Sequence, residues 1–159
     1  GGKLVEYSAH VVPEGGYAMV PDLVRDGVLL AGDAAGLCLN VGYTVRGMDL
    51  AVASGEAAAK AVMAARKAND FSEAGLASYK TLLDESFIMK DMNLYKNLPA
   101  FLDNSRIFND YPQMAAAVMR QMFTINGPEQ PLWKKLWGEV KKVGPWNLMK
   151  DGFKGVRSI

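Results

Sequence analysis

The residues best suited to chemistry in this chain lie in one short segment, between Gly32 and Gly47. Asp33 follows the apolar run 28–31 after a single residue, Gly32, so its carboxylate is expected at the end of a strand. Open α/β sheets bind ligands at the carboxyl ends of their strands. A carboxylate there can accept hydrogen bonds from sugar-type hydroxyls. Gly32 has no Cβ, so backbone can approach such a ligand closely at that position.

A helix predicted over residues 44–67 supplies the second part of this candidate site. It follows a loop that contains Gly36 and Gly42. A helix N-terminus presents unpaired backbone N–H groups and roughly half a positive charge. It therefore suits a ligand that carries negative charge near Asp33.

Two kinds of element must position these residues. Strands precede the segment around Asp33, and a helix rich in small residues follows it. The continuously apolar run 28–31 is typical of a strand buried on both faces of a parallel sheet. Residues 3–12 and 17–20 are two further predicted strands. Many small side chains in the helix 44–67 would let it approach this sheet closely.

Beyond about residue 70 the sequence predicts only helices and loops. Two helices are expected at 72–90 and 111–124, where Ser72 offers an N-cap and Pro112 suits the first turn. The expected class is α+β: a remnant of a ligand-binding sheet with few strands, a long helix and an all-helical C-terminal region. The expected division is 1–69 and 70–159.

The composition limits the kinds of ligand and metal site that this chain can form. The chain of 159 residues has a formal net charge of +1, so no overall field favours nucleic acid. Cys38 is the one cysteine, which excludes an internal disulfide and a four-cysteine iron–sulfur cluster within the chain. His10 is the one histidine and is expected to be an ordinary strand residue. We expect no metal site and a reduced, cytoplasmic setting.

Several motifs resemble one family of flavoproteins. The segment from strand to helix is similar to the second FAD fingerprint of the glutathione-reductase-like flavoproteins, which geranylgeranyl reductases share. The finer pattern resembles FixC-type electron-transfer flavoprotein–quinone oxidoreductases. The matching segments are Glu14-Gly15-Gly16-Tyr17, Gly32-Asp33-Ala34-Ala35-Gly36, Leu39-Asn40-Val41-Gly42, Arg46-Gly47-Met48-Asp49-Leu50-Ala51, Gly144-Pro145-Trp146 and Lys154-Gly155-Val156-Arg157.

The resemblance implies FAD as the cofactor. It places Asp33 on the ribityl hydroxyls and the backbone of residues 45–47 at the pyrimidine edge of the flavin. The cofactor-binding residues that it implies are Gly32, Asp33, Ala34, Gly42, Val45, Arg46 and Gly47. No catalytic side chain is implied.

The implied activity is electron transfer from an electron-transfer flavoprotein, through FAD, to a quinone or to a separate small ferredoxin. The pattern also departs from the family, because the chain has no Gly-x-Gly-x-x-Gly turn for the ADP half of FAD. It begins without methionine in what looks like mid-sheet sequence, so we expect an upstream part to be missing and the isolated chain to be inactive. A geranylgeranyl-reductase-like or hydroxylase-like flavoenzyme and a non-catalytic interaction module stay open as alternatives.

Three features have more than one interpretation. Cys38 is either a small buried hydrophobe or a redox thiol. Arg46 either raises the flavin potential or forms a salt bridge, for example with Asp49. The tail 131–159 mixes tryptophans with lysines. It can pack on the body of the protein, dock an acidic partner protein, or contact the inner face of a membrane as a peripheral surface.

Overall fold

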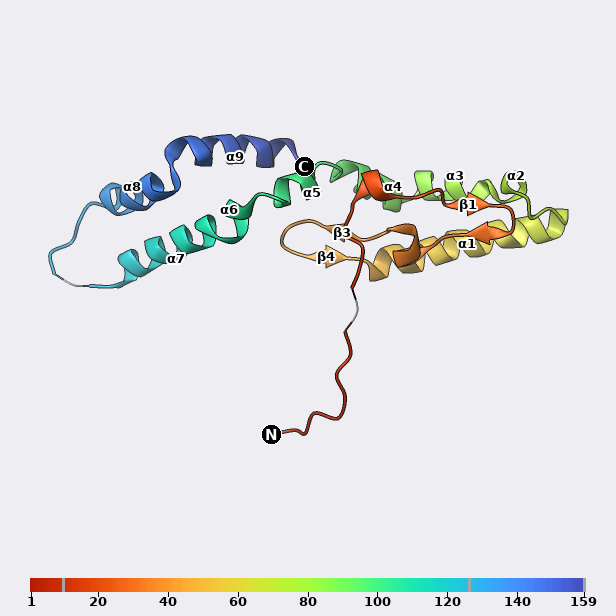
Figure 1. The fold of residues 1–159 in the computed structure, drawn as a ribbon, viewed down its shortest axis with the longest axis horizontal. Coiled ribbons are helices and arrows are strands. Elements are labelled where there is room, and N and C mark those ends of the chain that lie inside the picture. The colour runs from red at the N-terminus through yellow and green to blue at the C-terminus, as the bar shows by residue number, and fades with distance from the viewer. Residues whose placement is uncertain (10, 126, 159) are drawn as a thin grey trace. The chain divides into compact units, whose positions relative to one another are not determined.

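The structure is a computed structural model that describes residues 1–9, 11–125 and 127–158. It is mostly helical, with two small two-stranded antiparallel sheets near the N-terminus (Figure 1). The chain divides into two compact units, Gly1–Lys96 and Asn97–Ile159. We call these the N-terminal unit and the C-terminal unit and describe each by itself.

The N-terminal unit contains short strands, 3-10 turns and one long helix followed by shorter helices. In chain order its elements are η1 (Tyr17–Met19), β1 (Val24–Arg25), β2 (Val28–Leu29), η2 (Gly32–Ala35), β3 (Leu39–Asn40), β4 (Val45–Arg46), α1 (Met48–Ala68), α2 (Glu73–Leu76), α3 (Ser78–Glu85) and α4 (Phe87–Leu94). β1 pairs with β2, and β3 pairs with β4.

The core of this unit lies where α1 packs against α3 and η2, and where α3 packs against α4. Its largest fully buried side chains include Leu50, Tyr79, Leu83 and Ile88. The Tyr79 hydroxyl donates a 2.7 Å hydrogen bond to the Leu30 carbonyl, which ties the segment before η2 to α3. The core therefore fixes the position of the Gly-Asp motif relative to α1.

The predicted strands are largely wrong in detail. Among residues 3–9 and 11–12 the structure has no strand, and Val5 and Val11 are more than nine-tenths exposed. His10, predicted as an ordinary strand residue, lies outside the described residues. A strand needs a neighbour to accept its backbone hydrogen bonds, and none of the described residues pairs with this segment.

The other two predicted strands change in type or in environment. Residues 17–19 form the 3-10 helix η1 instead of a strand. In the run 28–31, only Val28–Leu29 is a strand; it pairs antiparallel with β1, and Val28 is half exposed. The run therefore contains a strand, as predicted, but the strand is shorter than expected and is not buried on both faces.

The helices follow the predictions more closely. The helix predicted from residue 44 begins at Met48, because Val45–Arg46 pairs with Leu39–Asn40. The Ser72 hydroxyl caps α2 as predicted, accepting a hydrogen bond from the Gly75 N–H. The predicted helix 72–90 is broken at Ala77 and again at Ser86, which caps α4 with its own hydroxyl. A capping serine inside a helical pattern is thus what the prediction missed.

The C-terminal unit is entirely helical within its described residues. Its elements are α5 (Leu98–Leu102), α6 (Ser105–Phe108), α7 (Asp110–Phe123), α8 (Leu132–Val143) and α9 (Pro145–Arg157). α7 covers the predicted helix 111–124, with Pro112 in its first turn. α8 packs on α7, and α9 packs on α5 and on α8.

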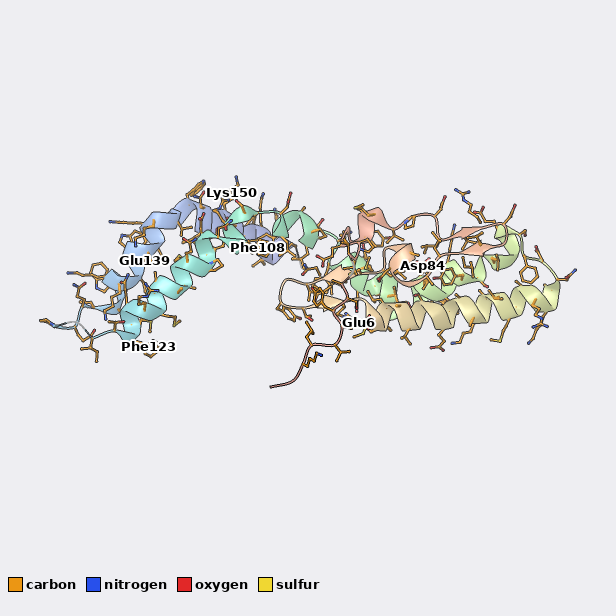
Figure 2. All side chains as sticks on the ribbon, turned by 60° about the horizontal axis from the view of Figure 1, so that its bottom comes forward. Glu6, Asp84, Phe108, Phe123, Glu139 and Lys150 are labelled. Carbon is orange, nitrogen blue, oxygen red and sulfur yellow. The ribbon has the colours of Figure 1, made fainter. Side chains whose placement is uncertain are left out.

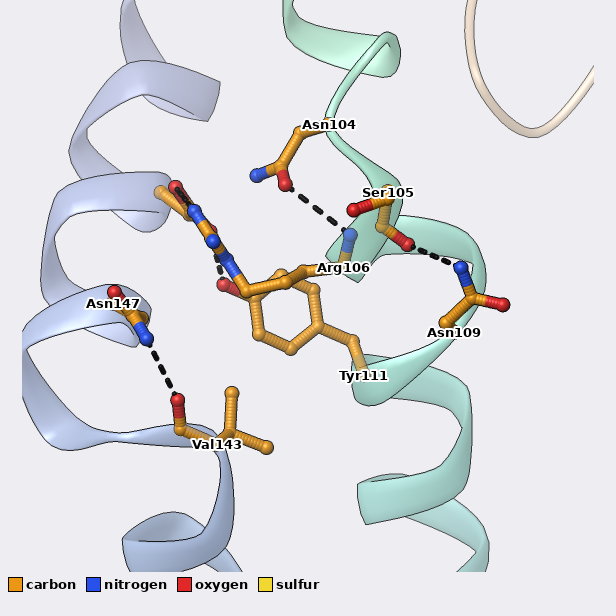
Figure 3. Close-up of polar contacts among 8 residues, drawn as sticks. Asn104, Ser105, Arg106, Asn109, Tyr111, Val143 and Asn147 are labelled. Carbon is orange, nitrogen blue, oxygen red and sulfur yellow. Dashed lines mark hydrogen bonds and ion pairs between the residues drawn. The ribbon is translucent and has the colours of Figure 1, made fainter.

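Polar side chains occupy the interior of the C-terminal unit. Arg106 donates hydrogen bonds of 2.7 and 3.1 Å to the two carboxylate oxygens of Asp151, and the Tyr111 hydroxyl also donates to Asp151 (Figure 3). Asp151 is 4% exposed. Hydrogen bonds from Arg106 and Tyr111 hold the pKa of the Asp151 carboxyl well below its usual range. This cluster joins α6 and α7 to α9.

The expected fold class is confirmed: small sheets near the N-terminus precede a long helix and a helical remainder. In the part of the chain that is described, no helix is both long enough and apolar enough to cross a membrane. The predicted division is between a portion of an FAD-binding domain, 1–69, and a helical region, 70–159. This division stays a prediction.

Candidate functional site

The candidate site begins where β2 leads into η2. Gly32 has a φ of 57°, a left-handed conformation that favours glycine. A Cβ at Gly32 would lie 3.2 Å from the Cβ of Ala51 on α1, so the two backbones approach closely here. The Gly32 N–H donates a 3.0 Å hydrogen bond to the Ser54 hydroxyl, which in turn donates to the Ala51 carbonyl. These contacts lock η2 onto the first turns of α1.

Asp33 follows on the exposed side of η2. It borders a hollow of about 430 Å³. The residues that line this hollow are Val12, Asp33, Cys38, Val45, Gly47, Met48 and Ala51. A Cβ built on Gly47 would lie 3.9 Å from Asp33 Oδ1 and 3.9 Å from Cys38 Sγ. The carboxylate and the residue that precedes α1 are therefore neighbours across the hollow, as the sequence predicts.

The start of α1 carries no side-chain cap. Gly47 is the N-cap residue and has no side chain to accept from the first N–H groups. Unpaired N–H groups in the first turn give a helix start a partial positive charge. The hollow thus has a carboxylate on one side, amide groups on another, and apolar side chains between them.

Arg46 is engaged in ion pairs. Its guanidinium lies 2.6 Å from an Asp49 carboxylate oxygen and 2.7 Å from one of Asp91. Its guanidinium carbon also lies 5.9 Å from the centre of the Phe87 ring. Hydrogen bonds to the two carboxylates raise the pKa of Arg46 further. The side chain therefore joins β4 to α4, in agreement with the salt-bridge interpretation.

Cys38 is buried at the base of the hollow. Burial, together with the negative charges of Glu14 and Asp33, raises the pKa of its thiol. A thiol that keeps its proton is a poor nucleophile. The burial of Cys38 agrees with the interpretation of a small apolar side chain rather than a redox thiol.

The structure brings together three of the residues predicted for cofactor binding: Asp33, Val45 and Gly47 line one hollow. Ala34 is exposed beside them in η2. Gly32 lies buried beneath the hollow against Ser54. These placements leave the binding roles themselves as predictions.

Gly42 lies elsewhere, in the turn between β3 and β4. Its φ is 89°, and its N–H donates a 2.8 Å hydrogen bond to Asn40 Oδ1. Gly42 therefore closes this turn, and it is not among the residues that line the hollow.

Three lining residues were not predicted as parts of the site: Val12, Met48 and Ala51. Ala51 had a readable signal, because it lies one helical turn after Gly47 and so faces the same side of the helix. Cys38 also had a signal, because it lies in the loop between Asp33 and Gly47. Val12 carried none, since only folding of the chain brings it to the hollow.

Comparison of the sequence with known proteins identifies a family and several relatives. Residues 98–159 match the ETF-QO/FixC family C-terminal domain. The chain is 60% identical over 157 residues to Protein FixC of Escherichia coli, covering 98% of this chain and 36% of that protein. It is 56% identical over 160 residues to the probable electron transfer flavoprotein-quinone oxidoreductase YdiS of the same organism, covering 100% of this chain and 37% of the relative.

The chain belongs to the ETF-QO/FixC family, and it corresponds to the C-terminal part of such a protein. A more distant member, Protein FixC of Azorhizobium caulinodans, is 36% identical over 163 residues, covering 99% of this chain and 37% of its own length. The chain thus spans little more than a third of the relatives that it matches. The family's C-terminal domain coincides with the C-terminal unit, whereas the Gly-Asp motif belongs to the N-terminal unit.

Proposed function

We propose that the hollow beside Asp33 is the flavin-ring half of an FAD site in the whole protein. One observation carries this proposal: the Asp33 carboxylate and the uncapped start of α1, at Gly47 and Met48, line the same hollow. A carboxylate suits the ribityl hydroxyls of FAD. A helix start suits the pyrimidine edge of the flavin, where negative charge gathers on reduction.

The residues present fit this half of the cofactor. Glycine at position 47 leaves the space between Asp33 and Cys38 free of any Cβ. Val45, Met48 and Ala51 give the hollow the apolar walls that a flat ring needs. The ADP half needs a glycine-rich turn at another helix start, and the sequence of this chain has none. We therefore assign the ADP half to the remainder of the whole protein.

In this proposal FAD, when bound, supplies the electron-carrying chemistry. The chain's own residues position the cofactor and adjust its surroundings. Asp33 accepts hydrogen bonds from the ribityl chain, and the first N–H groups of α1 stabilise negative charge at the ring edge. Gly32 and Ser54 hold these two elements together.

We further propose that the whole protein transfers electrons from an electron-transfer flavoprotein to a quinone, or to a separate small ferredoxin. The support is family membership, together with the name of one relative, a probable electron transfer flavoprotein-quinone oxidoreductase.

The proposal can be tested with Asp33→Ala in the whole protein. Loss of a charged hydrogen-bond acceptor costs about 1.5–3 kcal/mol, so we expect FAD affinity to fall roughly 10- to 100-fold. FAD bound per protein after dialysis and titration of the apoprotein measure this change. Asp84→Ala, which removes an exposed carboxylate from α3, is the matched control and is expected to keep full affinity. Equal FAD affinity in both variants would contradict the proposal.

A second test uses the 159-residue chain itself. Because it lacks the ADP-binding turn, we expect its affinity for FAD to be lower than that of the whole protein by roughly 100-fold or more. Fluorescence titration of both proteins with FAD measures the ratio. Comparable affinities would show that the chain holds a complete site.

A further inference from the structure

The last two helices of the C-terminal unit carry their large apolar side chains on the outside. Trp133 and Trp137 of α8 are 63% and 47% exposed, and Trp146 and Phe153 of α9 are 71% and 60% exposed. We call this surface the α8–α9 face. Its members are Trp133, Lys134, Leu136, Trp137, Lys141, Trp146, Met149, Lys150, Phe153, Lys154, Val156 and Arg157.

The inner sides of the same helices carry their acidic residues. Glu139 of α8 is nearly buried and accepts hydrogen bonds from Gln121 of α7 and from Lys142. Asp151 of α9 is buried against Arg106 and Tyr111. Both helices therefore use their acidic residues to contact the layer formed by α6 and α7. Figure 2 shows Glu139 on the side of α8 toward α7 and Lys150 on the outer side of α9.

This arrangement separates the charges of the two helices. Residues 132–157 contain seven lysines and arginines and two acidic residues. Both acidic residues, Glu139 and Asp151, are buried. The described part of the α8–α9 face consequently displays cations and apolar groups without an exposed carboxylate.

Cations and aromatic rings are also paired on this face. The Lys134 Nζ lies 5.7 Å from the centre of the Trp133 ring, and the Lys141 Nζ lies 6.0 Å from that of Trp137. On α9, the Arg157 guanidinium carbon lies 4.6 Å from the Phe153 ring centre. Such pairs keep a positive charge and an apolar ring at nearly the same height above the helix.

We propose that the α8–α9 face binds the surface of a lipid bilayer that contains anionic headgroups. At a bilayer surface the phosphate layer lies directly above the acyl chains, so paired cations and aromatic rings meet both layers at once. Both helices are strongly amphipathic but not apolar on average, which is typical of helices that lie in the interface plane.

The charges favour lipid over an acidic protein as the occupant. Lysines alone would serve to attract an acidic partner. Here large apolar side chains stand out among the lysines along both helices. That combination gains most from a surface that is both anionic and able to dissolve apolar groups.

Flotation of the whole protein with vesicles tests the proposal. The probes are vesicles of phosphatidylcholine alone and vesicles of phosphatidylcholine with phosphatidylglycerol. We expect binding to the anionic vesicles, weaker binding to the neutral ones, and loss of the difference at high salt. No binding of the unmodified protein to either vesicle would overturn the proposal.

Charge reversal provides the first variant. Lys134→Glu combined with Lys141→Glu is expected to lower partitioning onto anionic vesicles by about tenfold or more, because each cation near such a surface contributes to binding. Lys3→Glu combined with Lys67→Glu makes the same change in net charge at exposed positions in the N-terminal unit and is the matched control. An equal loss in both variants would overturn the proposal.

A second variant separates lipid from the other occupants. Trp146→Ala with Phe153→Ala is expected to weaken flotation about tenfold at unchanged thermal stability and unchanged FAD content. A lower melting temperature with normal flotation would place this face against the rest of the protein instead. Sensitivity to charge reversal without sensitivity to loss of the aromatic rings would indicate an acidic protein partner. Unchanged FAD content keeps the outcome independent of the flavin proposal.

Discussion

The two units of this chain differ in what they bury. The N-terminal unit encloses apolar side chains such as Leu50, Leu83 and Ile88 between α1, α3 and α4. In the described part of the C-terminal unit, Leu98 is the apolar side chain that is buried, and Glu139, Asp151 and Ser158 are the buried polar ones.

The difference shows that the two largely helical units are stabilised by different means. Burial of apolar area stabilises a unit without any partner, at about 25 cal/mol per Å². Buried ion pairs contribute less, because desolvation of the charges offsets much of their attraction. The C-terminal unit therefore fixes its geometry with polar contacts and leaves its apolar area for another surface.

The variant with the largest expected effect creates a cavity in the core of the N-terminal unit. Leu83→Ala removes a buried side chain of α3 and is expected to reduce the free energy of unfolding by about 2–5 kcal/mol. Hydrogen exchange of peptides from α1, α3 and α4 in the whole protein measures the loss. Val52→Ala, at an exposed position of α1, is the control and should change stability by less than about 0.5 kcal/mol. A small effect of Leu83→Ala would deny that this core carries the unit.

The corresponding change in the C-terminal unit is Asp151→Asn. It removes the carboxylate that Arg106 and Tyr111 share, so amide exchange in α6, α7 and α9 should accelerate about tenfold or more. Asp103→Asn, at an exposed carboxylate in the same unit, is the control. If Asp151→Asn leaves exchange unchanged, the polar cluster does not hold these helices together.

The pH dependence of stability tests the same polar cluster. The pKa of the Asp151 carboxyl is lower in the folded state than its ordinary value of about 3.9, because Arg106 and Tyr111 stabilise the charged form. A lowered pKa contributes stability above that ordinary value, and the contribution is lost as pH falls toward the folded pKa. We expect protection of α9 to decrease below about pH 4 in the unmodified protein and to depend less on pH in Asp151→Asn. Identical acid profiles would remove Asp151 as the cause.

The smallest expected effect concerns Arg46, which links β4 to α4 in the N-terminal unit. Its partners Asp49 and Asp91 are partly exposed, so Arg46→Met should cost at most about 1 kcal/mol of stability. Thermal melting of the whole protein measures this, with Arg66→Met near the end of α1 as the control. A loss as large as that of Leu83→Ala would mean that ion pairs matter as much in this unit as in the other.

Most of the correct predictions rest on residues that are close together in the sequence. Ser72 and Pro112 marked helix starts correctly, because capping and proline geometry depend on neighbours in sequence. The Gly-Asp motif pointed to Asp33 and Gly47 as neighbours, and they border one hollow. The break at Ser86 was missed because the surrounding apolar pattern continues across it.

Non-local contacts account for the remainder. Residues 3–12 have the composition of a strand, yet those that are described form none, since strand pairing requires another segment at hydrogen-bond distance. Val12 joins the hollow from a segment that lies more than 20 residues before Asp33. Nothing in the sequence indicated that Arg106 of α6 and Asp151 of α9 would meet across 45 positions.

The sequence by itself determined the family, the helices and the motif around Asp33, because each depends on residues close together in the chain. Only the tertiary structure decided which side of α8 and α9 faces outward. An amphipathic pattern specifies that a helix has two faces, whereas the contacts made by Glu139 and Asp151 select the one that is buried.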